Sequence, residues 1–138
     1  MIALVHGALG AACGTLLERR RPTVVAALVS HFVADAVNHE EPLDQGGNLR
    51  LRVITLDALL LGLALLLLWI RRGIFSSASL GAVAACLPDV GYFLLGSAVH
   101  KPFPHGRWPS RKIAVWWQFS MGTIAWLALL GCPSADDA

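Results

Sequence analysis

The sequence predicts an all-α bundle of four to five membrane-spanning helices, because it is rich in apolar residues and poor in charge. Of its 138 residues, 56% are hydrophobic and 14% are charged, whereas soluble domains average about 45–50% and about 25%. The mean hydropathy is +0.61. This balance disfavours an ordinary soluble enzyme or a disordered chain. The net charge of only +2 argues against nucleic acid as a partner. The predicted environment is the lipid bilayer.

Charged and proline-rich stretches divide the chain into five apolar segments, which we predict to be the helices of a single domain, residues 1–138. The segments are Ile2–Leu17, Thr23–Asn38, Val53–Ile70, Phe75–Val99 and Ile113–Leu130. A crossing helix needs about 20 residues, and the first two segments have only about 16 each. These two can therefore form a short tilted hairpin. Basic residues are shared almost evenly between the two predicted sides, so the orientation in the membrane stays open.

Ionisable side chains inside the apolar segments are the candidates for function. They are His6, His31, Asp35, Asp57 and Asp89, and none is Lys or Arg. A carboxylate at the bilayer centre costs about 2.5–3.5 kcal/mol, so such a residue is a functional candidate by default. Because the segments hold no Lys or Arg, protons, histidines or a metal ion must compensate the three acids.

The second segment carries a polar stripe. His31, Asp35 and His39 recur every four residues, so they share one side of a helix. In the first segment His6 and two glycines, Gly10 and Gly14, recur at the same interval. The glycines predict a face that can pack closely against another helix.

The polar residues of different segments are predicted to meet. Since consecutive spans run in opposite directions, the His and Asp residues of the segments all fall toward one membrane face. Two loop histidines, His100 and His105, follow the fourth segment. Histidines and carboxylates at similar depth suit Zn, Mn or Fe. The predicted metal ligands are His31, Asp35, His39 and Asp89, with Asp57 or His6 orienting a ligand or accepting a proton.

A simpler interpretation also stays open for each residue. A single His or Asp in a membrane helix often does no more than form a hydrogen bond to a neighbouring helix.

Two motifs carry a resemblance to known proteins. Ser30-His31-Phe32, followed by Asp35 and His39, and Leu87-Pro88-Asp89 resemble a group of small bacterial integral membrane proteins. That group is similar to the inner-membrane-associated metal-dependent hydrolases, and the resemblance runs from His6 to about Gln118. It implies location in the bacterial inner (cytoplasmic) membrane and a metal centre formed by His6, His31, Asp35, His39, Asp89 and His105. The relatives often carry a second acid where this chain has Gly91.

Three functions follow as hypotheses. The first is a metal-dependent hydrolase acting on a lipid or lipid-linked substrate, in which the ion would activate water. The alternative is a non-catalytic accessory subunit of a larger photosynthetic or respiratory membrane complex, which would explain the small size and the departure from the relatives' motif. A transporter or proton relay is the third, because intramembrane carboxylates and histidines suit proton transfer.

Overall fold

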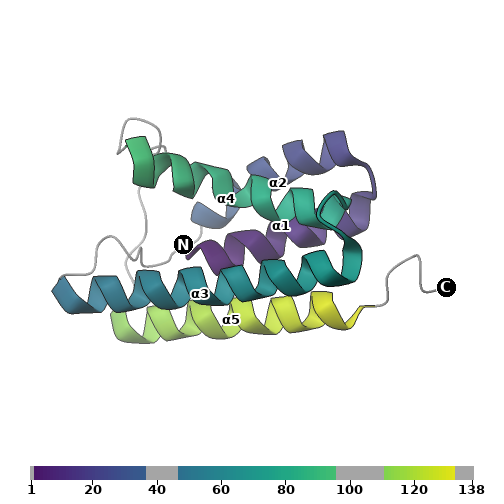
Figure 1. The fold of residues 1–138 in the computed structure, drawn as a ribbon. Coiled ribbons are helices and arrows are strands. Elements are labelled where there is room, and N and C mark those ends of the chain that lie inside the picture. Colours follow the sequence, from purple (N-terminus) through teal and green to yellow (C-terminus); the bar gives the residue numbers. More distant parts are fainter. Residues whose placement is uncertain (1, 37–46, 96–110, 133–138) are drawn as a thin grey trace.

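The computed structural model describes residues 2–36, 47–95 and 111–132, and this part of the chain forms five helices and no strand. Each helix overlaps one of the predicted apolar segments, which confirms the all-α prediction. The helices are α1 (Ala3–Leu17), α2 (Arg20–Asp35), α3 (Gly47–Arg72), α4 (Ser77–Leu95) and α5 (Arg111–Gly131) (Figure 1).

Successive helices run in opposite directions, as Figure 1 shows. The first two form a hairpin, because α1 ends at Leu17 and α2 begins at Arg20. The turn is made by Glu18, which has a positive φ of 55° and donates its N–H to the carbonyl of Gly14 at 3.1 Å. A residue in this left-handed conformation is a common way for a helix to end. The antiparallel order brings alternate helix ends to the same end of the bundle.

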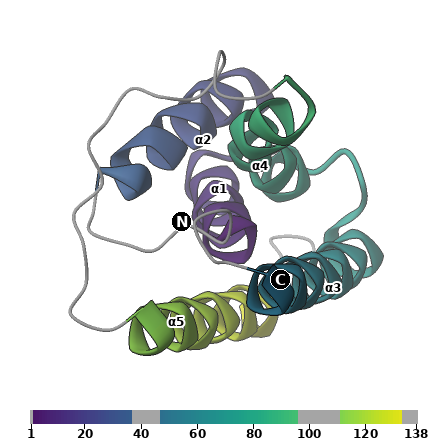
Figure 2. The same ribbon diagram turned by 90° about the vertical axis from the view of Figure 1, so that its left-hand side faces the viewer.

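Helix α1 lies at the centre of the bundle. In Figure 2, α2 and α4 lie on one side of it, and α3 and α5 lie on the other. The contact between α1 and α4 is a backbone contact, because a Cβ added to Gly10 would lie 2.1 Å from the carbonyl oxygen of Gly81. A Cβ on Gly14 would lie 2.2 Å from the carbonyl oxygen of Ser77. The predicted close-packing face of the first helix is therefore confirmed.

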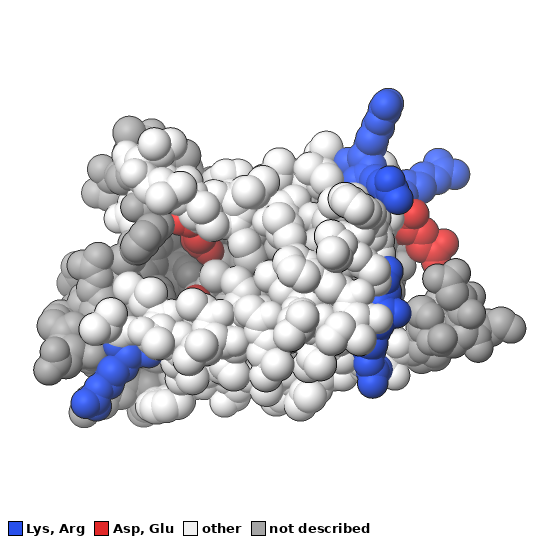
Figure 3. All heavy atoms as spheres, in the orientation of Figure 1, with Lys and Arg blue, Asp and Glu red and all other residues white. Residues whose placement is uncertain are grey.

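The outer surfaces of the helices are largely apolar. Exposed residues include Val25, Val29 and Val33 on α2 and Leu59 and Leu63 on α3. On the face drawn in Figure 3, basic side chains gather at one end and appear again at the lower left, and most of the surface between them is uncharged. The same view shows a hollow toward one end, with acidic side-chain atoms visible inside it.

One segment in the described part of the chain, Leu51–Arg72 of α3, is long and apolar enough to cross a membrane. Helix α1 is apolar but shorter, at 15 residues. The prediction of four to five spans goes beyond this finding and stays a prediction.

Candidate metal centre

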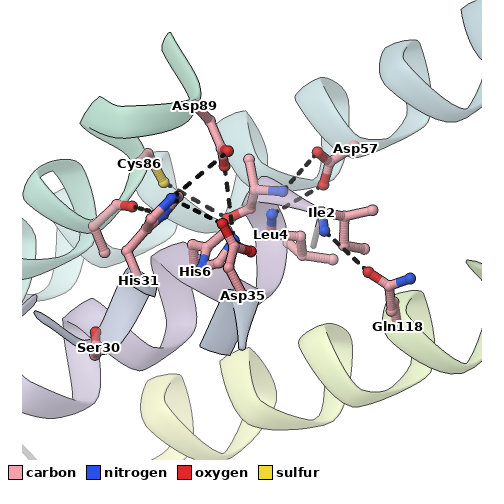
Figure 4. A network of polar contacts seen from close by, with 12 residues as sticks. Ile2, Leu4, His6, Ser30, His31, Asp35, Asp57, Cys86, Asp89 and Gln118 are labelled. Atoms are coloured by element: carbon pink, nitrogen blue, oxygen red, sulfur yellow. Dashed lines mark hydrogen bonds and ion pairs between the residues drawn. The ribbon is translucent and has the colours of Figure 1, made fainter. Parts of the chain in front are cut away.

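Four of the predicted site residues meet at one end of the bundle (Figure 4). His6 lies near the start of α1, His31 and Asp35 lie near the end of α2, and Asp89 lies in the second half of α4. The antiparallel order of the helices produces this meeting, since it places the start of α1 beside the ends of α2 and α4. The predicted convergence of these four residues is confirmed.

The two imidazole rings stack against each other and face the carboxylates with the same nitrogen. The ring centroids of His6 and His31 are 4.0 Å apart. Their Nε2 atoms lie 3.1 and 3.2 Å from the two carboxylate oxygens of Asp35, and 3.9 and 4.0 Å from those of Asp89. Both histidines are fully buried and Asp35 is nearly so, whereas the Asp89 side chain is 29% exposed. The cluster is therefore accessible at Asp89.

A hydrogen bond at the other ring nitrogen of His31 indicates which of its two nitrogens carries the proton. Its Nδ1 lies 2.8 Å from the carbonyl oxygen of Ala85 on α4. A carbonyl can only accept, so Nδ1 carries a proton and donates it. In the neutral ring Nε2 then has a lone pair, and this lone pair faces carboxylate oxygens. A proton shared between Nε2 and a carboxylate oxygen, or a metal ion at Nε2, would suit this arrangement, and metal-binding histidines commonly donate their other N–H in this way.

Pro88 lies in the same part of α4 as the Ala85 carbonyl. A proline inside a helix has no N–H to offer to the carbonyl four residues earlier, which here belongs to Ala84. Neighbouring helices often supply donors to backbone groups near such a break. His31 of α2 makes its hydrogen bond at the next residue, Ala85. The Leu87-Pro88-Asp89 motif thus places both an acid and an interrupted helix turn beside His31.

Three donor atoms of the cluster are close enough together that they could hold a metal ion. One atom from each of His6, His31 and Asp89 lies within 4.8 Å of the other two. Donors around a tetrahedral zinc ion are about 3.4 Å apart, so small side-chain rotations would complete the site. Nδ1 of His6 and Oδ2 of Asp89 are buried without a hydrogen-bond partner among the described residues. Two histidines and one carboxylate leave a coordination position open, as catalytic zinc and iron sites do.

Asp35 contacts both imidazoles of this group, and the ligand role predicted for it stays a prediction. Its oxygens lie at hydrogen-bonding distance from both imidazoles, but the three donors that converge closely come from His6, His31 and Asp89. The geometry thus favours His6 as a metal ligand, in agreement with the metal centre that the family resemblance implies.

Asp57 of α3 lies beside the cluster in Figure 4 and contacts a different part of the protein. Its two carboxylate oxygens accept hydrogen bonds from the backbone N–H groups of Ala3 and Leu4, each at 2.9 Å. The catalytic role predicted for Asp57 stays a prediction.

Two α5 residues that contact the start of α1 were not singled out by the sequence. Gln118 accepts the N–H of Ile2 at 3.1 Å, and Trp126 donates its indole N–H to the carbonyl of Leu4 at 2.9 Å. An amide side chain within an apolar segment, as at Gln118, is the signal that would have found the first of them.

Other predicted ligands cannot be placed. His39, His100 and His105 lie outside the described residues, so the ligand roles given to His39 and His105 stay predictions.

Comparisons of the chain with protein-family models, curated proteins and solved structures give no match. The family resemblance carried by the His31 and Asp89 motifs therefore stays a prediction as well. The interpretation of the cluster rests on its geometry.

Proposed function

We propose that this protein is a small membrane-embedded hydrolase whose His6, His31 and Asp89 side chains bind a divalent metal ion, with Zn, Mn or Fe as candidates. The observation that carries the proposal is the orientation of His31. Its Nδ1–H is held by the Ala85 carbonyl, so Nε2 faces the carboxylates with its lone pair. A single divalent ion would also bind the second imidazole, whose Nε2 faces the same carboxylates.

The proposed chemistry is the hydrolysis of an ester or phosphoester. A divalent ion supplies Lewis acidity, which makes water a usable nucleophile near neutral pH. Asp35 lies against both imidazoles and is held within hydrogen-bonding distance of them, so it is the candidate acceptor for the proton of that water. Asp89 is the exposed member of the cluster, and we propose that substrate approaches from its side.

A lipid or lipid-linked substrate fits the surroundings of the site. The helices that carry the cluster expose apolar residues, such as Val29 on α2 and Leu94 on α4, and α3 includes a segment able to cross a membrane. In a bilayer, the cluster at one end of the bundle would lie near one membrane face. The headgroup linkages of lipids lie at that depth.

The test is elemental analysis of the protein purified in detergent. We expect about one equivalent of metal per chain, by the chemistry of a three-ligand site, and loss of that metal in the double variant His31→Ala/Asp89→Ala. The matched control is Ser30→Ala/Leu87→Ala, which alters the same two helices beside the cluster. Among the described residues, Ser30 bonds to the carbonyl of Ala27 in its own helix, and Leu87 is 52% exposed.

Circular dichroism of each variant shows whether the helices remain. Metal-free wild-type protein with its helices intact would overturn the proposal. Retention of full metal by the double variant would do the same, because the ion would then be held elsewhere.

A second candidate is the non-catalytic subunit of a larger membrane complex, and α5 is the observation that favours it. This helix exposes two large aromatic residues, Trp116 at 63% and Trp117 at 54%, and aromatic residues are enriched at protein interfaces as well as at membrane surfaces. The mass of the species extracted under native conditions separates the two candidates. A metal-free chain found only in a larger assembly would favour the subunit.

A further inference from the structure

We propose that Asp57 is a positioning residue, which holds the start of α1 and thereby sets the place of His6 in the metal centre. This inference rests on the proposed function for its consequence, but its geometry is independent of any metal. It concerns a residue that the cluster itself does not include.

The contact is between a carboxylate on α3 and the free end of another helix. The first N–H groups of a helix have no acceptor within it. In α1, the N–H groups of Ala3 and Leu4 donate to Oδ2 and Oδ1 of Asp57, each at 2.9 Å. Asp57 is 8% exposed, so water is largely excluded. A negative charge at this end also interacts favourably with the helix dipole.

Helix α5 completes the attachment of the same helix end. Gln118 accepts the N–H of Ile2 at 3.1 Å, and the carbonyl of Ile2 in turn accepts the N–H of His6 at 3.5 Å. Trp126 holds the Leu4 carbonyl from the same side. The backbone of His6 is thus within one turn of contacts to both α3 and α5 (Figure 4).

The arrangement explains why a buried acid lies so near the cluster without joining it. Both oxygens of Asp57 are used by α1. His6 reaches the cluster from the first helical turns, the part of a helix that frays most readily when its N–H groups lack acceptors. Fixing that turn fixes the direction in which His6 Nε2 points. Sub-ångström placement matters for a ligand.

The experiment compares Asp57→Ala and Asp57→Asn with the wild-type protein in detergent. The matched control is Thr55→Ala, an exposed position on the same helix. Three measurements are made: amide hydrogen exchange at Ala3 and Leu4, the ¹⁵N chemical shifts of the His6 imidazole in metal-free protein, and Co²⁺ affinity with the visible Co²⁺ spectrum. The last two report on His6 and its ligand geometry, which a purely structural contribution of Asp57 to stability would leave unchanged in the folded protein.

In both variants we expect faster hydrogen exchange at both amides and changed ¹⁵N chemical shifts of the His6 imidazole. Both effects should be larger for Asp57→Ala than for Asp57→Asn. The Kd for Co²⁺ should rise about 10–100-fold, as for other residues that orient metal ligands, with an altered spectrum. Thr55→Ala should match wild type.

Unchanged exchange, or faster exchange with unchanged His6 chemical shifts, would overturn the positioning role. Wild-type protein that binds no Co²⁺ would contradict the proposed function, while exchange and the His6 shift would still decide the role of Asp57. If Asp57→Ala does not fold, Asp57→Asn, which keeps the side-chain shape, decides it.

Discussion

At the scale of single residues, the two acids of the cluster differ in what surrounds them. Asp35 is 2% exposed and lies within 3.2 Å of both imidazoles, whereas Asp89 is 29% exposed and lies 3.9 and 4.0 Å from them. In the proposed metal centre, the more exposed Asp89 would be the acid that can move onto the ion and contact substrate. Asp35 is held in place, which suits the orientation of ligands or the acceptance of a proton.

Replacing Asp35 by asparagine tests this division. Asp35→Asn keeps the shape of the side chain and removes its charge, so we expect the metal to remain bound with a Kd raised about 10–100-fold, and turnover to fall more than binding. Isothermal titration with Zn²⁺ measures the first effect. Ser30→Ala, one turn earlier on α2, is the control. An unchanged Kd would show that Asp35 does not act on the ligands.

At the scale of helices, the cluster depends on how closely α1 approaches α4. The backbones of Gly10 and Gly81 touch, since a Cβ on either residue would lie 2.1 Å from the carbonyl oxygen of the other. Because His6 lies one turn before Gly10, and Asp89 two turns after Gly81, this approach sets their separation. Small residues commonly allow such contacts between membrane helices.

A methyl group at this contact should therefore affect both stability and metal binding. We expect Gly81→Ala to lower the free energy of unfolding by about 1–3 kcal/mol, because the backbones must separate, and to weaken Co²⁺ binding. The control is Gly62→Ala on α3, where an added Cβ meets nothing within 4 Å. That change should be neutral, or stabilising by up to about 1 kcal/mol. Unfolding in detergent measures both variants, and equal stability of the two would contradict the close contact.

At the scale of the whole molecule, basic residues gather at one end of the bundle, and the described helices expose many large apolar side chains along its sides. The basic side chains of Arg19–Arg21 and Arg71–Arg72 lie at one end, where α1 joins α2 and α3 joins α4, while most of the surface away from that end is uncharged in the view of Figure 3. Soluble monomers rarely expose a continuous apolar surface of this kind. The distribution is the one expected if lipid covers the sides of the bundle.

An arginine introduced at one of two exposed leucines of α3 would distinguish lipid from water around this helix. Leu63 is 54% exposed near the middle of the helix, and Leu51 is 67% exposed near its start. In a bilayer, Leu63→Arg should make the free energy of membrane insertion of α3 less favourable by about 3 kcal/mol. It should also reduce the fraction of protein that resists carbonate extraction from membranes. Leu51→Arg, close to the headgroups, should have little effect. Equal extraction of the two variants would show that lipid does not surround the middle of α3.

The sequence by itself determined the five helices, their boundaries to within a few residues at most ends, and the end of the bundle where the polar residues lie. These features follow from local properties: the length of each apolar segment, the charges between segments, and the reversal of direction at each connection. The close-packing face of the first helix was predictable for the same reason, since residues four apart always share a side.

Only the tertiary structure decided which polar groups touch one another. The hydrogen bond from His31 to the Ala85 carbonyl, the use of both Asp57 oxygens by α1, and the contact of Gln118 with Ile2 join residues more than 50 positions apart. They depend on the rotation and tilt of each helix against its neighbours. Side-chain packing across helices sets those angles, and the spacing of residues along one helix does not record them.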